Sequence, residues 1–195
     1  DISEDNLKFK EKAGKYIDFL NANAYDKERD VRTNIAGEFQ KSNLAAALQT
    51  AELICGRLDE DKIYEALSQI RISGRMEEIA PGIIVDVSHN IQGMQGFVQT
   101  VEANYHGMKK RILFAASHQN EEEYMKNILK TIPEIEAFYT VGIHKRRIDE
   151  AEFQDAFRKM IDRNQETTVC FVVGSFYLAG MAKEFINQEE ENVRL

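Results

Sequence analysis

The sequence predicts an α/β protein built on a Rossmann-like, mostly parallel sheet with helices on both faces. Two observations and one general rule support this prediction. From Met76 onward, short apolar runs typical of strands alternate regularly with amphipathic helix patterns. Two of the runs, 111–116 and 168–173, are almost continuously apolar, as parallel strands buried on both faces should be. Parallel strands joined through helices require right-handed crossovers, which place helices on both faces of the sheet.

The alternating region is expected to contain four strand–helix pairs. The expected strands span 82–87, 111–116, 135–141 and 168–173, and the helices that follow them span 92–105, 121–132, 150–163 and 177–187. The first of these helices is amphipathic, because Met94, Phe97, Val98, Val101 and Tyr105 recur on one face.

The preceding half of the chain reads mainly as helix. Apolar residues at helical spacing predict a helix over 43–58 that begins at a Ser42 cap. Asp59 is expected to cap a second helix, and the turn at Ser73-Gly74 ends this half. We therefore expect a domain boundary near Gly74, with one unit over 1–73 and the complete α/β unit over 74–195.

Two alternatives fit residues 1–36. Short strands are one, around Ile17–Leu20 and Val31–Ile35, and a single helix over Leu7–Leu20 is the other. Because the chain begins with Asp1 rather than Met, we expect it to be a processed or excerpted part of something longer.

Composition narrows the function classes. The formal net charge of −8 argues against general nucleic-acid binding, which depends on neutralising phosphates. No apolar run approaches the length of a membrane helix and no signal-peptide pattern opens the chain, so we expect a cytoplasmic protein with no membrane partner. Cys55 and Cys170 fall in elements expected to be buried, which favours two buried thiols over a disulfide.

Polar side chains follow the predicted strands where each strand ends. The carboxyl ends of parallel strands share one edge of a sheet, and ligands bind beyond that edge, near helix N-termini that favour anions. The residues in question are Asp86, Ser88 and His89 after the first strand, Ser117, His118 and Asn120 after the second, His144 to Arg147 after the third, and Gly174 and Ser175 after the fourth. The sequence therefore predicts a site for an anionic ligand.

Several candidate sites have ordinary explanations. Three histidines, His89, His118 and His144, lack a fixed ligand spacing, so we do not expect a zinc site or any other metal site. The basic run 145–147 is best explained as a surface charge cluster. Arg75 is either part of a solvated turn or a guanidinium directed at phosphate. A Walker phosphate loop is absent from the sequence.

Four motifs in order are more specific than any one of them. They are G-E-F-Q-K-S-N-L-A at 37–45, G-R-M-E at 74–77, D-V-S-H-N at 86–90 and G-S-F-Y-L-A-G at 174–180. Together they resemble the folylpolyglutamate synthase and dihydrofolate synthase family of Mur-type ATP-dependent ligases, over roughly residues 35–182. Gln40 and the last motif favour the folate branch over the cell-wall branch. Phe39 departs from the family's His, and Val87-Ser88 departs from its Gly-Ala.

The resemblance implies a domain organisation. Family members have a large N-terminal ATPase domain and a smaller C-terminal α/β domain, with ATP between them. Residues 1–73 are then expected to be the C-terminal remnant of the central ATP-binding domain, and residues 74–195 the Mur ligase C-terminal domain. The N-terminal ATPase domain, which carries the phosphate loop and most Mg²⁺ ligands, is the expected partner.

The resemblance also implies residue roles. Asn43 would approach the adenine, Arg75 and His89 the phosphates, and Asp86 the ribose. Ser175 would help to place the incoming glutamate. The implied reaction consumes ATP to form an acyl phosphate on a folate carboxyl, which the amine of L-glutamate then attacks; catalysis of this kind rests on positioning and charge stabilisation.

Three functions follow in order of preference. The first is the C-terminal part of an ATP-dependent folate–glutamate ligase, inactive by itself. The second is a cell-wall-type ligase that acts on a nucleotide-linked peptide. The third is a non-catalytic module that binds a nucleotide or a partner, a hypothesis that the missing phosphate loop keeps open.

Overall fold

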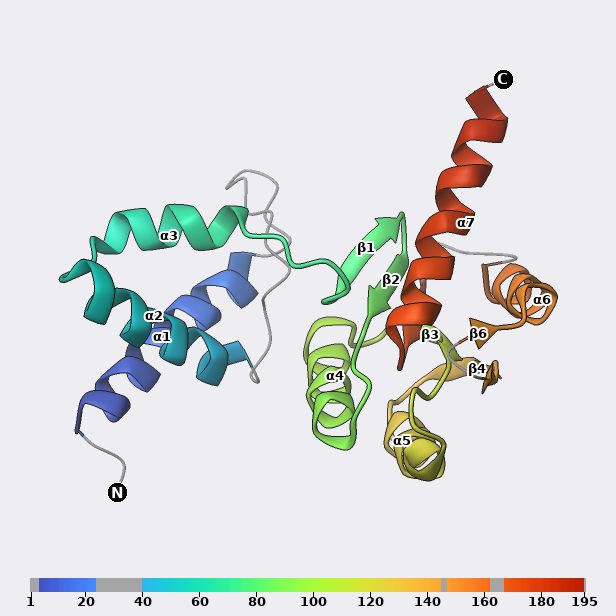
Figure 1. Cartoon of the computed structure of the whole chain (residues 1–195), viewed down its shortest axis with the longest axis horizontal. Helices are drawn as coiled ribbons and strands as arrows, with labels where there is room; N and C mark the ends of the chain where they lie inside the picture. Colours follow the sequence, from blue (N-terminus) through green and yellow to red (C-terminus); the bar gives the residue numbers. More distant parts are fainter. Residues whose placement is uncertain (1–3, 24–39, 145–146, 162–166, 195) are drawn as a thin grey trace. The chain divides into compact units, whose positions relative to one another are not determined.

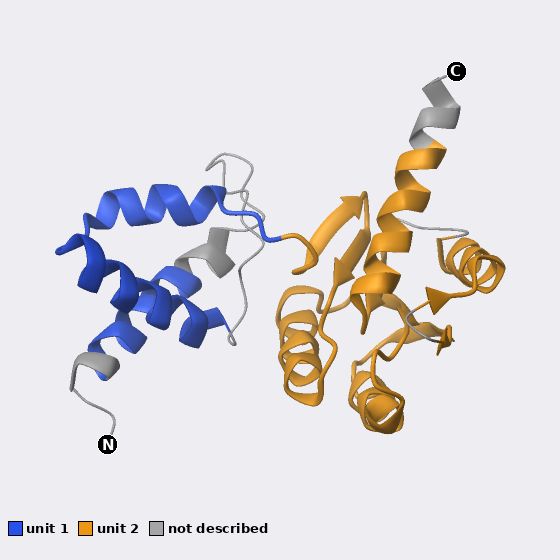
Figure 2. Cartoon of the chain, viewed as in Figure 1, with its two compact units in different colours: residues 1–72 blue, residues 73–195 orange. Residues whose placement is uncertain are grey.

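The computed structural model describes residues 4–23, 40–144, 147–161 and 167–194 of the chain. The chain divides into two compact units, residues 1–72 and 73–195 (Figure 2). This division lies one residue before the boundary that the sequence predicts. Each unit has its own apolar core.

The first unit is helical in its described part, with α1 (Glu4–Asn23), α2 (Gln40–Cys55) and α3 (Glu60–Gln69). Of the two alternatives for the start of the chain, the helix is right and the strand at 17–20 is wrong. Phe9, Ala13 and Ile17 recur one helical turn apart and pack against α2 and α3. The other expected strand, 31–35, lies outside the described residues, as does the first part of the 37–45 motif.

The two predicted caps have different outcomes. Asp59 caps α3 as expected, because its Oδ1 accepts a hydrogen bond from the Lys62 amide at 3.2 Å. The Ser42 cap is wrong, since α2 already begins at Gln40 and Ser42 lies inside its first turn. Cys55 corrects another expectation: it is exposed at the end of α2, where the helix no longer packs on the core.

The hydroxyl of Tyr16 is a buried polar group without a hydrogen-bond partner in the described part of the chain. Burial, followed by the charge of Glu60, raises the pKa of this phenol to about 12. An unsatisfied buried hydroxyl costs stability, so Tyr16→Phe is expected to raise the free energy of unfolding by about 1 kcal/mol. Chemical denaturation of the two proteins measures this change, and a loss of stability in Tyr16→Phe would show that the hydroxyl has a partner.

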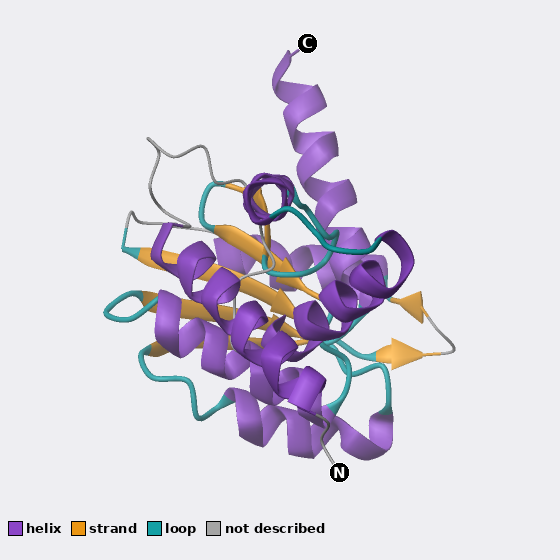
Figure 3. Ribbon diagram, turned by 90° about the vertical axis from the view of Figure 1, so that its left-hand side faces the viewer, coloured by secondary structure: helices purple, strands orange, loops and turns teal. Residues whose placement is uncertain are grey.

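The second unit contains a five-stranded sheet in the order β1-β2-β7-β3-β4 (Figures 1 and 3). Its strands are β1 (Glu77–Ala80), β2 (Ile83–Asp86), β3 (Lys109–Phe114), β4 (Ile135–Thr140) and β7 (Thr168–Val173). The last four are parallel to one another, which confirms the predicted fold class. The sequence missed β1, a short antiparallel edge strand that is only partly buried and lacks an apolar run.

Helices cover both faces of this sheet. The helices α4 (Ile91–Asn104) and α5 (Glu122–Leu129) pack on one face, and α6 (Glu150–Ile161) and α7 (Phe176–Arg194) pack on the other. Side chains of β7 point alternately to the two faces of the sheet, so this strand contributes to the apolar core on each face. Phe171 faces α4 and α5, whereas Cys170 and Val172 face α6 and α7. The buried Cys170 thiol fits the prediction, and burial raises its pKa to about 11.

Two small elements were not predicted. A 3₁₀ turn, η1 (Gln119–Glu121), precedes α5, and a separate antiparallel ribbon pairs β5 (Ile143–His144) with β6 (Arg147–Ile148). None of the described helices is both long and apolar enough to span a bilayer.

Candidate functional site

The loops after β2 and β7 form the candidate site, because these neighbouring parallel strands send the chain in opposite directions. From β2 the chain continues to α4 on one face, and from β7 it continues to α7 on the other face. In open α/β sheets, ligands bind beyond the carboxyl ends of strands at such a switch point. The first and last polar strand ends predicted from sequence, 86–89 and 174–175, lie at this place.

The two helices that start here lack acidic residues in their first turns, whereas α3, α5 and α6 all begin with acids. Asn90 caps α4 by accepting a hydrogen bond from the Gly93 amide at 2.7 Å. Ser175, fully buried, accepts one from the Tyr177 amide at 3.1 Å at the start of α7. The positive ends of both helix dipoles therefore face no acid from their own first turns, an arrangement that favours an anion.

Asp86 ends β2 and is 1% exposed. Its Oδ1 accepts hydrogen bonds from the Ser88 amide at 2.8 Å and the Ser88 hydroxyl at 2.6 Å, and its Oδ2 accepts one from the Met76 amide at 3.0 Å. The carboxylate thus joins the D-V-S-H-N loop to the G-R-M-E turn, two motifs that are apart in sequence.

The protonation of Asp86 gives a prediction for stability against pH. Burial raises the pKa of Asp86, although the Ser88 hydroxyl, the Met76 and Ser88 amides and Arg75 act to lower it. The folded chain then holds this proton more tightly than the unfolded chain. The stabilising contribution is complete below the unfolded pKa of about 3.9 and is lost as pH rises through the folded value. The free energy of unfolding of wild type minus that of Asp86→Asn should therefore fall as pH rises above about 4. Denaturation series at several pH values measure this difference, and a rising difference would contradict the assignment.

Arg75 lies in a turn of the second unit, and the preceding residue, Gly74, is hydrogen-bonded through both its amide and its carbonyl. The Gly74 amide donates to Glu77 Oε2 at 2.6 Å, and the Gly74 carbonyl accepts from the Val87 amide at 2.8 Å. A Cβ at Gly74 would lie 2.7 Å from Val87 Cγ1, and the residue has a φ of +71°. Gly74 is therefore required by close packing and by its backbone angle.

The guanidinium of Arg75 is half-buried and forms no ion pair within 4 Å among the described residues, but it lies near enough to Asp86 to lower that residue's pKa. A cationic side chain on a fixed backbone, without a carboxylate partner in this part of the structure, is suited to an incoming anion.

His89 has a defined ring orientation. Its Nδ1 lies 2.9 Å from the Val87 carbonyl oxygen, and because a carbonyl only accepts, this nitrogen carries the proton. The ring also contacts Phe176 at the start of α7, with ring centroids 5.4 Å apart. Since Nδ1 is committed, Nε2 can donate to an anion only when the imidazole is doubly protonated.

The structure does not gather all the predicted polar residues. His118 and His144 are exposed after β3 and within β5, and the described residues include no group of three or more side chains able to hold a metal ion. The Ser117 hydroxyl joins the site through a 3.4 Å hydrogen bond to the Gly174 carbonyl. Residues 145–146 lie outside the described ranges, and Arg147 is exposed.

Asn43 is in the other unit, exposed on α2, where its amide donates to Gln40 Oε1 at 2.9 Å.

Two residues near the candidate site in the second unit were missed by the sequence analysis. Phe176 contacts His89 and is 58% exposed, and Lys183 on α7 forms an ion pair with Glu77. Phe176 could have been chosen from the sequence, because it is an aromatic residue within the G-S-F-Y-L-A-G motif. The pairing of Lys183 with Glu77 could not, because it depends on the tertiary fold alone.

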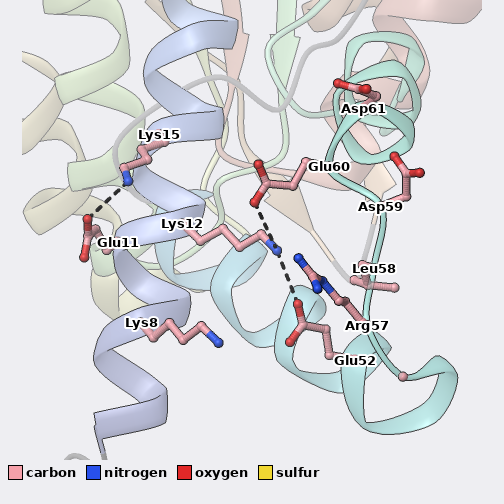
Figure 4. A pocket seen from close by; sticks show the side chains of 11 residues that line it. Lys8, Glu11, Lys12, Lys15, Glu52, Arg57, Leu58, Asp59, Glu60 and Asp61 are labelled. Carbon is pink, nitrogen blue, oxygen red and sulfur yellow. Dashed lines mark hydrogen bonds and ion pairs between the residues drawn. The ribbon is translucent and has the colours of Figure 1, made fainter.

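The first unit has a hollow of about 1270 Å³ between α1 and the connection from α2 to α3 (Figure 4). Its walls mix bases and acids that pair with one another: Lys12 lies 3.2 Å from Glu52 and 3.9 Å from Glu60, and Lys15 lies 3.2 Å from Glu11. Since these charges are largely compensated within the chain, the hollow is a weaker candidate than the edge of the sheet.

Comparisons with known proteins identify the fold. No protein-family model matches the chain, and no curated protein matches it in sequence. Solved structures match with TM-scores of 0.66 for Escherichia coli FolC in complex with DHPP and ADP, 0.58 for folylpolyglutamate synthetase from Lactobacillus casei and 0.57 for folylpolyglutamate synthase from Thermotoga maritima. The identities are 16%, 20% and 21%, and the matches cover 77%, 77% and 80% of this chain. They cover only 40%, 38% and 40% of those chains, so this chain spans about two fifths of their length. The chain therefore shares the fold of part of these enzymes, as the motifs predicted.

Proposed function

We propose that this chain is the C-terminal region of an ATP-dependent ligase that adds glutamate to folates. The observation that carries the proposal is the sheet edge after β2 and β7, where two helices begin without first-turn acids, His89 contacts Phe176 at the start of α7, and Arg75 lies near Asp86. The shared fold supports it, because solved structures with this fold include complexes with ADP and DHPP, and with AMPPCP and folate.

The residues at this edge are suited to phosphates. Arg75 presents a fork of donors, and protonated His89 presents Nε2, so both would neutralise charge on phosphoryl oxygens. ATP would supply the phosphoryl group that converts a folate carboxylate into an acyl phosphate, which the glutamate amine attacks. This chain would contribute positioning and charge stabilisation.

Asp86 and Ser175 have structural duties here. Asp86 already accepts three hydrogen bonds from its own loops, and Ser175 caps α7. We propose that Asp86 reaches a ribose hydroxyl only through the acceptor capacity left on Oδ2, and that Ser175 affects glutamate placement by fixing the start of α7. Among the described residues of this edge, no group of three or more carboxylate, imidazole or thiol side chains could coordinate Mg²⁺.

The domain assignment is part of the same proposal. The first unit would be the remnant of the central ATP-binding domain, bringing Asn43 to the adenine, and residues from Ser73 onward would form the glutamate-ligase domain. The phosphate loop would then come from the N-terminal ATPase domain. A cell-wall-type ligase and a non-catalytic nucleotide-binding module are the competing functions.

The test is release of ADP by the full-length protein, with ATP, a panel of folates and glutamate. ADP release that depends on both folate and glutamate supports the proposal, and it should fall at least tenfold in Arg75→Ala because a charge-stabilising donor is lost. Arg71→Ala is the control, since Arg71 is an exposed arginine four positions earlier. Release stimulated by a nucleotide-linked peptide instead of folate would favour the cell-wall ligase, and tight nucleotide binding without turnover would favour the module.

A further inference from the structure

Lys183, in the second turn of α7, connects that helix to the turn that carries Arg75. Its Nζ lies 2.7 Å from Glu77 Oε2 and donates to the Ser73 hydroxyl at 2.6 Å. Glu77 Oε2 also accepts from the Gly74 amide at 2.6 Å and from the Ser73 hydroxyl at 3.3 Å. Glu77 Oε2 is thus bonded both to Lys183 of α7 and to Ser73 and Gly74, the two residues that precede Arg75.

The residue after Arg75 is fixed as well. The Met76 amide donates to Asp86 Oδ2, and Met76 has a φ of +40°, an angle that L residues rarely adopt. The peptide unit after Arg75 is therefore held by the Asp86 carboxylate, and the unit before it is held by the Val87 amide, while Glu77 holds the amide of the preceding residue, Gly74. Such a backbone limits the directions in which the guanidinium can extend.

The Lys183–Glu77 pair contributes little to stability by itself. Both side chains are partly exposed, at 30% and 26%, and ion pairs of this kind are screened by solvent. Burial tends to raise the pKa of Glu77, but the bonds from Lys183, the Gly74 amide and Ser73 outweigh it and hold that pKa below its usual value. Glu77 therefore stays ionised at neutral pH and continues to accept the hydrogen bond from the Gly74 amide.

We infer that Lys183 is a positioning residue for Arg75, holding the G-R-M-E turn in the conformation that directs the guanidinium at the phosphates of the nucleotide. This inference rests on the proposed function. Lys183 does not need to touch the ligand; it acts by keeping Glu77 on the Gly74 amide. The Lys183–Glu77 interaction thus connects α7, which begins at the proposed phosphate-binding edge, to the turn that carries Arg75.

The test compares Lys183→Met, Lys183→Arg and Arg75→Ala in the full-length protein, with Lys159→Met as control. Lys159 is also a helix lysine, paired with Asp155 at 2.6 Å, but it lies on α6. Lys183→Met is expected to raise the KM for ATP about tenfold, because small misplacements of a binding group are costly, with little change in melting temperature. Lys183→Arg should recover most of the loss, and Lys159→Met should match wild type.

The double variant Arg75→Ala/Lys183→Met separates the possible failures. If Lys183 acts through Arg75, adding Lys183→Met to Arg75→Ala should not raise the KM further. Additive losses, or a normal KM in Lys183→Met beside a raised KM in Arg75→Ala, would overturn the positioning role alone. A normal KM in Arg75→Ala itself would instead remove Arg75 from the proposed site. As a readout without turnover, pyrophosphate added to the 195-residue chain should shift the Arg75 Nε–H resonance in wild type and much less in Lys183→Met.

Discussion

His89→Ala is expected to lower ligase turnover of the full-length protein on the order of 100-fold while leaving its thermal unfolding almost unchanged. Loss of one preorganised donor to developing charge typically costs this much in rate. The ring is only half-buried and contacts the Val87 carbonyl oxygen and the exposed Phe176 ring, so little core is removed. Steady-state ADP release and differential scanning fluorimetry on the same preparations measure the two quantities.

His106→Ala is the matched control, because His106 is exposed in the turn before β3, at the opposite edge of the sheet. An unchanged rate together with a lowered melting temperature would show that His89 is a structural residue.

Gly174→Ala is expected to lower the free energy of unfolding of the second unit by about 3 kcal/mol or more. Gly174 has a φ of +109°, and a Cβ there would lie 2.5 Å from the Ala115 carbonyl oxygen and 2.6 Å from the Phe114 ring. The backbone oxygen cannot move without disturbing the end of β3, because the amide of Ala115, the residue after that strand, donates to the Val173 carbonyl at 3.2 Å. Overpacking and the unfavourable backbone angle therefore add.

Gly107→Ala isolates the backbone part of this cost. Gly107 has a similar φ of +77°, but a Cβ there would meet no atom within 4 Å. Its substitution should cost only about 1 kcal/mol, the penalty of the left-handed angle. Urea denaturation of both variants gives the comparison, and equal losses would show that the approach of Gly174 to Ala115 is not tight.

Much of the second unit follows from the sequence, because its signals are local. The β7 strand spans 168–173 as predicted, since a run of buried apolar residues has few other conformations that bury both faces. The helix after β2 follows from Met94, Phe97 and Val101 at helical spacing. Asp86, His89 and Ser175 were correctly predicted to share one edge of the sheet, because residues that directly follow parallel strands lie at the same edge.

Other features depended on residues distant in sequence. The edge strand β1 has no apolar run of its own and exists because β2 supplies its hydrogen bonds. The sequence could not pair Lys183 with Glu77, 106 positions apart by their numbers, because only the packing of α7 beside the G-R-M-E turn brings them to 2.7 Å. The sequence marked Gly74 as the turn at a domain boundary, whereas the Val87 side chain and its amide fix it to the sheet.

The sequence by itself thus determined the fold class, the strand ends and the residue types that can bind an anion, because hydrophobic period and chain order encode them. The tertiary structure decided what those residues are free to do. Buried hydrogen bonds commit Asp86 to its own loops and Ser175 to the cap of α7, and a carbonyl fixes the tautomer of His89. Arg75 remains without an ion pair within 4 Å in the described structure, although it lies near enough to Asp86 to act on that residue's pKa.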